Sequence, residues 1–173
     1  MISPNLEKAL NKQLNLELYS AYVYAAMAAH FEHKHLNGFA NWMRLQVKEE
    51  VDHAIKFYAY IGDISGRIEL DAIAKPPTDF KTVLSVFEDS LAHERTVTTA
   101  IYKLMDLALS ESHHATSTFL QWFVTEQVEE EKVADDIRKR LELVGNSPEG
   151  LFMLDHELGL RKAGESDGKD SGS

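Results

Sequence analysis

The chain of 173 residues contains no cysteine and few residues that interrupt helices. Without thiols it forms no disulfide, no cysteine-based zinc site and no thiolate nucleophile. Its 4 prolines and 9 glycines concentrate near the ends of the apolar patterns, which favours long helices. No stretch approaches the ~18 uninterrupted apolar residues of a membrane span, and the N-terminus has no apolar signal core. We therefore expect a cytoplasmic protein with no membrane partner.

Basic residues are in the minority, with 18 Lys and Arg against 28 Asp and Glu and a formal net charge of −10. This balance argues against nucleic acid or an anionic surface as a partner and suits a protein that attracts cations. Because cysteine is absent, any metal must be held by carboxylate, imidazole or amide groups. Such ligands suit iron, manganese or zinc.

Apolar residues recur every three or four positions in five segments, which predicts five helices. Ser3 can cap the first helix, Asn37 the second, and Gly66 is expected to end the second. The expected helices span about residues 4–34, 38–64, 81–109, 113–143 and 148–162.

The loops determine the expected topology. The breaks after the first and third helices are short, so each pair forms an antiparallel hairpin. Residues 67–79 can extend about 40 Å at ~3.3 Å per residue, which is the length of a 27-residue helix. The prediction is an all-α four-helix bundle with one long crossover and a short fifth C-terminal helix. One domain should span residues 1–163, followed by a mobile polar tail over residues 164–173.

One set of candidate metal ligands occurs twice in the chain at a constant offset. Glu50 and His53 are spaced i, i+3, so they project from one helix face and can hold one ion. Two such half-sites predict two metals between four helices. The offset is 77 residues (94 − 17, 127 − 50, 130 − 53) and relates Glu17, Glu50 and His53 to Glu94, Gln127 and Glu130.

Several stretches resemble the non-haem ferritins of bacteria and archaea, over residues 3–162. Ligand types, their spacing and the flanking aromatic residues all agree, and the resemblance implies the ferritin-like fold. The stretches are QLNLELYSAY at 13–22, GFANWM at 38–43, EEVDHA at 49–54, His93-Glu94, and FLQWFVTEQVEEE at 119–131.

The resemblance implies a di-iron centre. It assigns Glu17, Glu50 and His53 to the first iron, with Glu50 as the bridge. It assigns Glu94 and Glu130 to the second iron.

The second half of the centre departs from the symmetric pattern. Bacterioferritins and rubrerythrins carry a second bridging Glu and a second His where this chain has Gln127 and Glu130. We expect the second iron to be held less firmly, as suits iron that must move on, and we keep Gln127 among the candidate metal residues. Val51 stands where bacterioferritins carry the haem-ligating Met, so haem is not expected.

A third iron site is also implied by the resemblance, from Glu49, Glu126 and Glu129, sharing Glu130. Residues 126, 129 and 130 lie on one helix face, which supports this site. The alternative is that residues 129–131 are a solvated acidic run.

Two aromatic residues lie near the expected centre. Tyr24 is two turns beyond Glu17, and the family's tyrosine at this position hydrogen-bonds near the iron pair and supplies an electron. The alternative for Tyr24 is a core residue with a satisfied hydroxyl. Trp122 is either a second redox-active aromatic or a packing residue.

The function implied is iron storage with ferroxidase activity. Fe(II) would be oxidised by dioxygen or peroxide, and Fe(III) oxide deposited inside a homo-oligomeric shell of 24 chains. One alternative is a rubrerythrin-like di-iron peroxidase or oxidase without storage, which Gln127, Glu130 and the lack of cysteine disfavour. Another is a structural subunit without an oxidation centre, which the complete ligand set disfavours.

Overall fold

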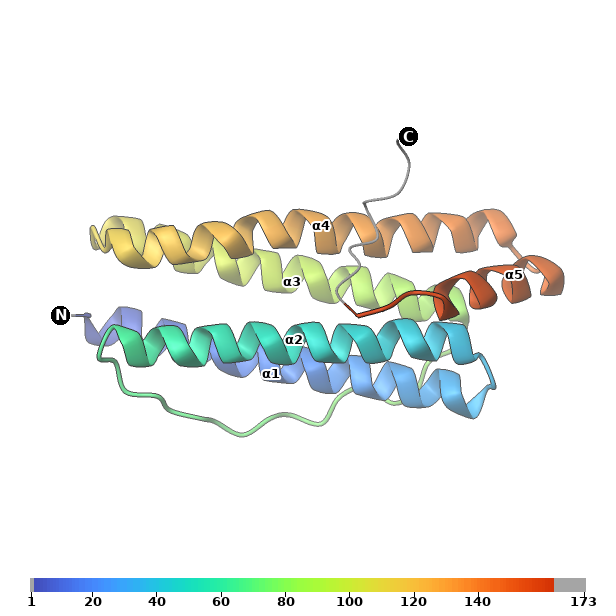
Figure 1. Ribbon diagram of the computed structural model, residues 1–173, viewed down its shortest axis with the longest axis horizontal. Coiled ribbons are helices and arrows are strands. Elements are labelled where there is room, and N and C mark those ends of the chain that lie inside the picture. Colours follow the sequence, from blue (N-terminus) through green and yellow to red (C-terminus); the bar gives the residue numbers. More distant parts are fainter. Residues whose placement is uncertain (1, 164–173) are drawn as a thin grey trace.

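The structure, a computed structural model, describes residues 2–163 and forms five α-helices there, with no strand in that range. The four long helices make an elongated bundle, and the fifth lies at one end of it (Figure 1). The all-α prediction is confirmed, although the fifth helix ends three residues before residue 162. The helices are α1 (Pro4–His33), α2 (Asn37–Asp63), α3 (Val83–Ser110), α4 (His114–Val144) and α5 (Pro148–Gly159).

The topology has one long crossover, as predicted. The α1 and α2 helices pack as one hairpin, α3 and α4 as another, and α1 also contacts α3. In Figure 1, α2 and α3 run in the same direction, and the segment between them returns along the length of the bundle. The predicted tail over residues 164–173 lies outside the described residues.

The helix ends follow the predicted capping in one place and differ in another. The Ser3 side chain accepts a hydrogen bond from the Leu6 N–H at 3.0 Å, as expected of a cap. The prediction that Asn37 caps α2 was wrong, because Asn37 is already inside the helix and no side chain of its own segment caps it. Asp155 of α5 takes this position instead.

Asp155 joins α5 to the start of α2. One of its carboxylate oxygens accepts hydrogen bonds from the backbone N–H of Gly38 at 2.9 Å and of Phe39 at 3.0 Å. A negative charge is favourable at a helix N-terminus, where the backbone N–H groups are unpaired. A long-range contact therefore replaces the local cap and fixes α5 against α2.

The end of α2 also differs from the prediction. The helix ends at Asp63, and the left-handed residue that terminates it is Ser65, with φ 59°, rather than Gly66. The Gly66 N–H then donates to the Ile61 carbonyl at 2.8 Å, which closes the turn.

The core consists of two apolar clusters with a polar layer between them. The cluster near α5 includes Phe31, Trp42 and Phe87, and the cluster at the opposite end includes Phe57 and Phe123. Buried polar and charged side chains at intermediate positions of the four long helices separate the two clusters. Both clusters hold the helices together, so the polar layer is held in place from two sides.

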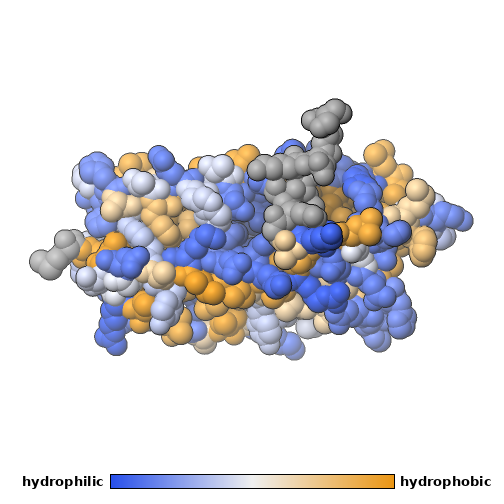
Figure 2. All heavy atoms as spheres, in the orientation of Figure 1, coloured by the Kyte–Doolittle hydropathy of each residue, from blue (hydrophilic) through white to orange (hydrophobic). Residues whose placement is uncertain are grey.

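Apolar side chains also remain at the surface on three parts of the fold. Figure 2 shows apolar residues at the end of the molecule that α5 occupies. Exposed apolar patches are typical of surfaces that contact other protein chains. The exposed residues include Tyr22, Ile55 and Tyr58 on α1 and α2, Tyr102, Leu109 and Val128 on α3 and α4, and Phe152 and Met153 on α5.

None of the helices in the described range is both long and apolar enough to cross a membrane.

Replacing Gly38 by Ala tests the docking of α5. A Cβ at this position would lie 1.5 Å from the Asp155 carbonyl oxygen, so α5 has to shift. We expect a lower thermal midpoint, because forced repacking costs about 1–3 kcal/mol. In the control Gly62→Ala, a Cβ meets nothing within 4 Å. That change should raise the midpoint, since Ala is favoured over Gly in a helix by about 0.5–1 kcal/mol. Equal midpoints in circular dichroism melts would contradict this account.

Candidate metal centre

Six of the predicted ligand residues meet in the polar layer of the bundle. Each is at most 9% exposed, and all four long helices contribute. The 77-residue offset places the two sets at the same level, because the two hairpins pack side by side. They are Glu17 from α1, Glu50 and His53 from α2, Glu94 from α3, and Gln127 and Glu130 from α4.

A first ligand group consists of Glu17, Glu50 and His53, whose ligand atoms lie within 4.8 Å of one another. One oxygen of Glu17 and one of Glu50 (each Oε2) are buried and have no hydrogen-bond partner among the described residues. His53 Nδ1 lies 3.5 Å from this Glu50 oxygen. Buried carboxylate oxygens without partners are costly, and a cation removes that cost. The donor set of oxygen and imidazole nitrogen fits iron.

A second ligand group shares His53 with the first. It consists of His53, Glu126 and Glu130, again with ligand atoms within 4.8 Å of one another. The Gln46 side-chain amide donates a hydrogen bond to one member of this group, Glu130, at Oε2 over 2.9 Å. His53 thus belongs to two groups that could each hold a cation.

Glu94 belongs to neither group, and both of its oxygens are held by donors of the protein. The Tyr24 hydroxyl donates to Oε1, and the Gln127 amide donates to Oε2 at 3.1 Å. Tyr24 also lies 3.1 Å from the Ser90 hydroxyl. Gln127 therefore orients Glu94, where a second carboxylate would repel it.

The residues predicted for a third site are only partly brought together. Glu126 joins the second group, and Glu129 lies half-buried near it. Glu49 is in neither group, and both of its oxygens accept hydrogen bonds from Arg161 at 3.1 Å. Glu131, which the prediction left out, pairs with Arg95 at 3.6 Å.

Burial sets the protonation of the layer. Desolvation raises the pKa of Glu17 to about 7, and it raises the pKa of Glu50, Glu94 and Glu130 above the usual range. Neighbouring carboxylates add to the rise. Desolvation also lowers the pKa of His53 to about 4, so its imidazole is neutral and can bind a metal. A cation that binds in this layer would therefore compete with protons and release them.

The aromatic residues near the centre occupy different environments. Tyr24 is fully buried and in direct contact with Glu94. Trp122 is 41% exposed, and its ring centroid lies 5.4 Å from that of His53. Lys56 Nζ lies 4.2 Å from the Trp122 ring centroid, on the same side of the bundle.

Several supporting residues were not found from the sequence. Gln13 donates to Glu17 at 2.7 Å, and its i, i+4 spacing on one helix was a signal that pointed to it. His93 lies 2.8 Å from the Ser20 hydroxyl, and burial lowers its pKa to about 4. Arg161 comes from beyond α5, and no local pattern predicts its contact with residues more than 100 positions earlier.

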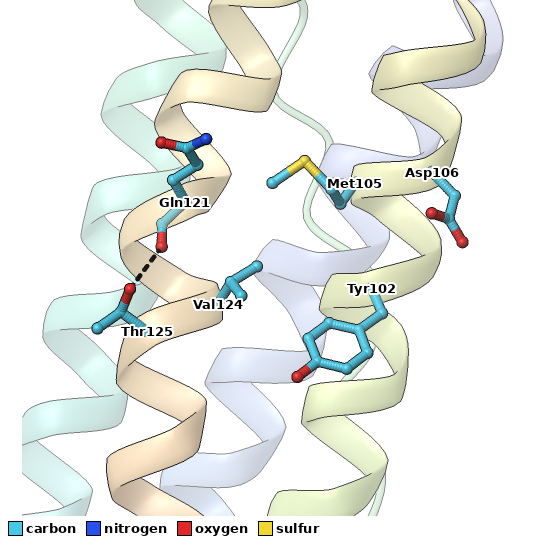
Figure 3. Close-up of a pocket in the computed structure, with 6 residues that line it drawn as sticks. All are labelled: Tyr102, Met105, Asp106, Gln121, Val124 and Thr125. Atoms are coloured by element: carbon cyan, nitrogen blue, oxygen red, sulfur yellow. Dashed lines mark hydrogen bonds between the residues drawn. The ribbon is translucent and has the colours of Figure 1, made fainter.

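A groove of about 550 Å³ lies apart from the centre, between α3 and α4 (Figure 3). None of the candidate ligands lines it. The Thr125 hydroxyl donates to the Gln121 carbonyl beside it at 3.2 Å. The groove belongs to the outer surface of the second hairpin, and its lining residues are Tyr102, Met105, Asp106, Gln121, Val124 and Thr125.

The raised pKa of Glu17 predicts a pH-dependent effect of Glu17→Gln on the metal-free protein. A carboxyl group with a raised pKa stabilises the fold below about 4.5, and this contribution is lost as the pH rises through about 7. At pH 8 the ionised Glu17 is therefore destabilising. Glu17→Gln should raise stability there, on the order of 2 kcal/mol, and much less at pH 5.5.

Thermal melts at both pH values, with chelator present, measure this difference. Glu88→Gln, at an exposed position of α3, is the matched control and should shift the midpoint equally at both pH values. A Glu17→Gln effect that is the same at pH 5.5 and pH 8 would contradict the raised pKa.

The chain is similar to known proteins over most of its length. The family model described as "Ferritin-like domain" matches residues 7–144. The bacterial non-heme ferritin of Staphylococcus aureus (strain USA300) is 40% identical over 161 residues, covering 93% of this chain and 97% of the relative. The one from Staphylococcus epidermidis is 41% identical over 165 residues, covering 95% and 99%.

Solved structures agree with this similarity. The open pore ferritin of the hyperthermophilic archaeon Archaeoglobus fulgidus superposes with a TM-score of 0.93 at 44% identity, covering 94% of this chain and 100% of that one. An engineered closed form of the same ferritin superposes with a TM-score of 0.92. The sequence match and the fold thus agree with a buried carboxylate and histidine layer at the middle of the bundle, and the chain belongs to the ferritin family of non-haem iron-storage proteins.

Proposed function

We propose that this chain oxidises Fe(II) at a di-iron centre in the polar layer and stores the product as Fe(III) oxide inside a shell of its own copies. The observation that carries the proposal is the pair of buried, partnerless oxygens of Glu17 and Glu50 beside His53. Membership of the ferritin family supports iron as the substrate. A rubrerythrin-like enzyme is not favoured, because Gln127 and Glu130 replace its second Glu-x-x-His.

The ligands have distinct roles in this proposal. Glu17, Glu50 and His53 bind the first Fe(II), and Glu50 is shared with the second. Glu94 and Glu130 bind the second Fe(II). The hydrogen bonds of Gln127 and Tyr24 to Glu94 support this role, because they orient the carboxylate before iron arrives.

The reaction balances with two iron ions for each two-electron oxidant. Two Fe(II) ions each give up one electron, and dioxygen with two protons becomes hydrogen peroxide. With peroxide as the oxidant, the same two electrons and two protons give two molecules of water. Carboxylate ligands favour the higher charge of Fe(III), which drives the oxidation forward. Hydrolysis of Fe(III) then releases protons as the oxide forms.

Tyr24 is proposed as an electron donor when a single Fe(II) is at the centre: one electron from Fe(II) and one from the phenol then supply the two that the oxidant takes. Its hydroxyl hydrogen bond to Glu94 gives the phenol proton an acceptor when the ring loses an electron. Burial and the surrounding carboxylates raise the pKa of Tyr24 well above its usual value, so the phenol stays protonated until then.

A third Fe(II) is proposed to bind beside the pair, at Glu49, Glu126 and Glu129 with Glu130 shared. The second ligand group supports Glu126 and Glu130 in this role. Glu49 takes part once Arg161 releases its carboxylate.

The storage shell is proposed to contain 24 copies, each a ferritin-like domain of residues 1–163, in the cytoplasm. Exposed apolar side chains on α1 and α2, on α3 and α4, and on α5 support this, because a closed shell needs several different contact surfaces on each chain. The groove between α3 and α4 adds a concave surface to the second of these (Figure 3).

Glu50→Ala tests the oxidation centre. It removes the bridging carboxylate, so fast Fe(II) oxidation should fall by about 100-fold or more, since even outer-shell partners of a metal contribute about 10–100-fold. Stopped-flow absorbance after oxygen is mixed with anaerobically loaded protein measures the rate. Glu88→Ala, at an exposed site, should oxidise iron like the wild type. An unaffected rate in Glu50→Ala would refute the site assignment.

Particle mass tests the storage shell. At 19.6 kDa per chain, 24 copies give about 470 kDa (24 × 19.6 kDa) before iron is added. Mass photometry before and after loading with several hundred Fe(II) per particle should show this species and then a heavier one. Rapid oxidation by a small species, with the iron precipitating outside it, would refute storage and leave the oxidation centre standing.

A further inference from the structure

The residue after the cap of α5 reaches back into the bundle. The α5 helix ends at Gly159 with Leu160 as its cap, and Arg161 follows directly. Asn41 of α2 donates to the Arg161 carbonyl at 3.2 Å, and Asp155 fixes the helix to the start of α2. The backbone of this segment is therefore anchored beside the polar layer.

The Arg161 guanidinium binds the proposed third site through Glu49. Its Nη2 donates to both Glu49 oxygens at 3.1 Å, and its Nη1 donates to Gln46 Oε1 at 2.7 Å. The carbon of the guanidinium lies 5.4 Å from the Trp42 ring centroid. The side chain is only 9% exposed. An arginine keeps its charge when buried, so it needs a counter-charge, and Glu49 supplies it.

The contact extends one step further, to a ligand of the centre. Gln46 uses its amide oxygen for Arg161, so its amide nitrogen faces Glu130 and donates to Oε2 at 2.9 Å. Arg161 thereby orients the Gln46 amide so that its nitrogen, and not its oxygen, faces the ligand Glu130. One guanidinium holds both Glu49 and, through Gln46, Glu130.

We propose that Arg161 is a positioning residue that occupies the Glu49 side of the third iron position as an internal cation. A third divalent ion binds there only when the guanidinium leaves. This inference rests on the third site of the proposed function and names what regulates it. A dication on Glu49 with Arg161 still bound would place two positive charges side by side in a poorly solvated site.

The proposal gives an order of filling. Among the described residues, Glu17, Glu50, His53 and Glu94 make no hydrogen bond with Arg161, and Glu130 is linked to it through Gln46 rather than directly, so the first two ions bind without displacing the guanidinium. The third ion has to displace the guanidinium, so it binds last and more weakly. Its arrival also frees the amide oxygen of Gln46.

Binding of Zn(II), which is not oxidised, tests this order apart from the reaction. Arg161→Gln removes the competing charge, so we expect the third Zn(II) per chain to bind about tenfold more tightly, with the first two unchanged, since one half-buried ion pair is lost. Arg95→Gln is the matched control, because it removes a charge from an exposed pair with Glu131. Isothermal titration calorimetry on the assembled protein measures all three affinities.

Trp42 fluorescence provides a second measurement that a merely structural role of Arg161 would not change. In a Trp122→Phe background only Trp42 remains of the 2 tryptophans. We expect its emission to shift with the third Zn(II) and not with the first two. In Arg161→Gln this step should vanish, because no guanidinium leaves the ring.

The outcomes separate this inference from the proposed function. Arg161→Gln could still bind two Zn(II) ions tightly and bind the third with unchanged or lower affinity. This result would overturn the inference and leave the proposed di-iron centre standing. Loss of the third ion in Glu49→Gln, together with tighter binding in Arg161→Gln, supports it. Should Arg161→Gln fail to assemble, Arg161→Met also removes the charge while keeping an unbranched side chain, and an unchanged third affinity there would overturn the inference.

Discussion

The structure depends on four carboxylates buried at one level of a helical bundle. Glu17, Glu50, Glu94 and Glu130 have lost water, and repulsion between them adds to the cost, so burial raises the pKa of each. Two apolar clusters, one on each side, keep the helices together despite this cost. The layer is therefore suited to bind cations, and membership of the ferritin family supports iron as the cation.

The protein offsets part of this repulsion with donors, and it does so unequally. Glu94 has both oxygens occupied by Tyr24 and Gln127, whereas Glu17 and Glu50 each keep a partnerless oxygen. We therefore expect the first half of the proposed centre to bind cations more strongly, whereas the second half is held in place mainly by hydrogen bonds. Such a difference suits iron that is bound, oxidised and then moved into storage.

Much of the fold could be predicted because it follows from local patterns. Helix spans, the hairpins and the crossover depend on apolar periodicity and loop length, which lie within short windows of sequence. The start of α2 could not be predicted, because Asp155 caps it from more than 100 residues away. The left-handed residue that ends α2 is Ser65 although Gly66 follows it, because the hydrogen bond from Gly66 to Ile61 fixes the position of the turn.

The sequence by itself determined the candidate ligands and their two-fold repeat. An i, i+3 spacing fixes which side chains share a helix face, and a constant offset places two hairpins in register. Only the tertiary structure decided what each ligand meets: Gln127 donates to Glu94, His53 belongs to two ligand groups, and Arg161 binds Glu49. These contacts join different helices, and helix periodicity carries no information about which side chain of a neighbouring element fills the space opposite.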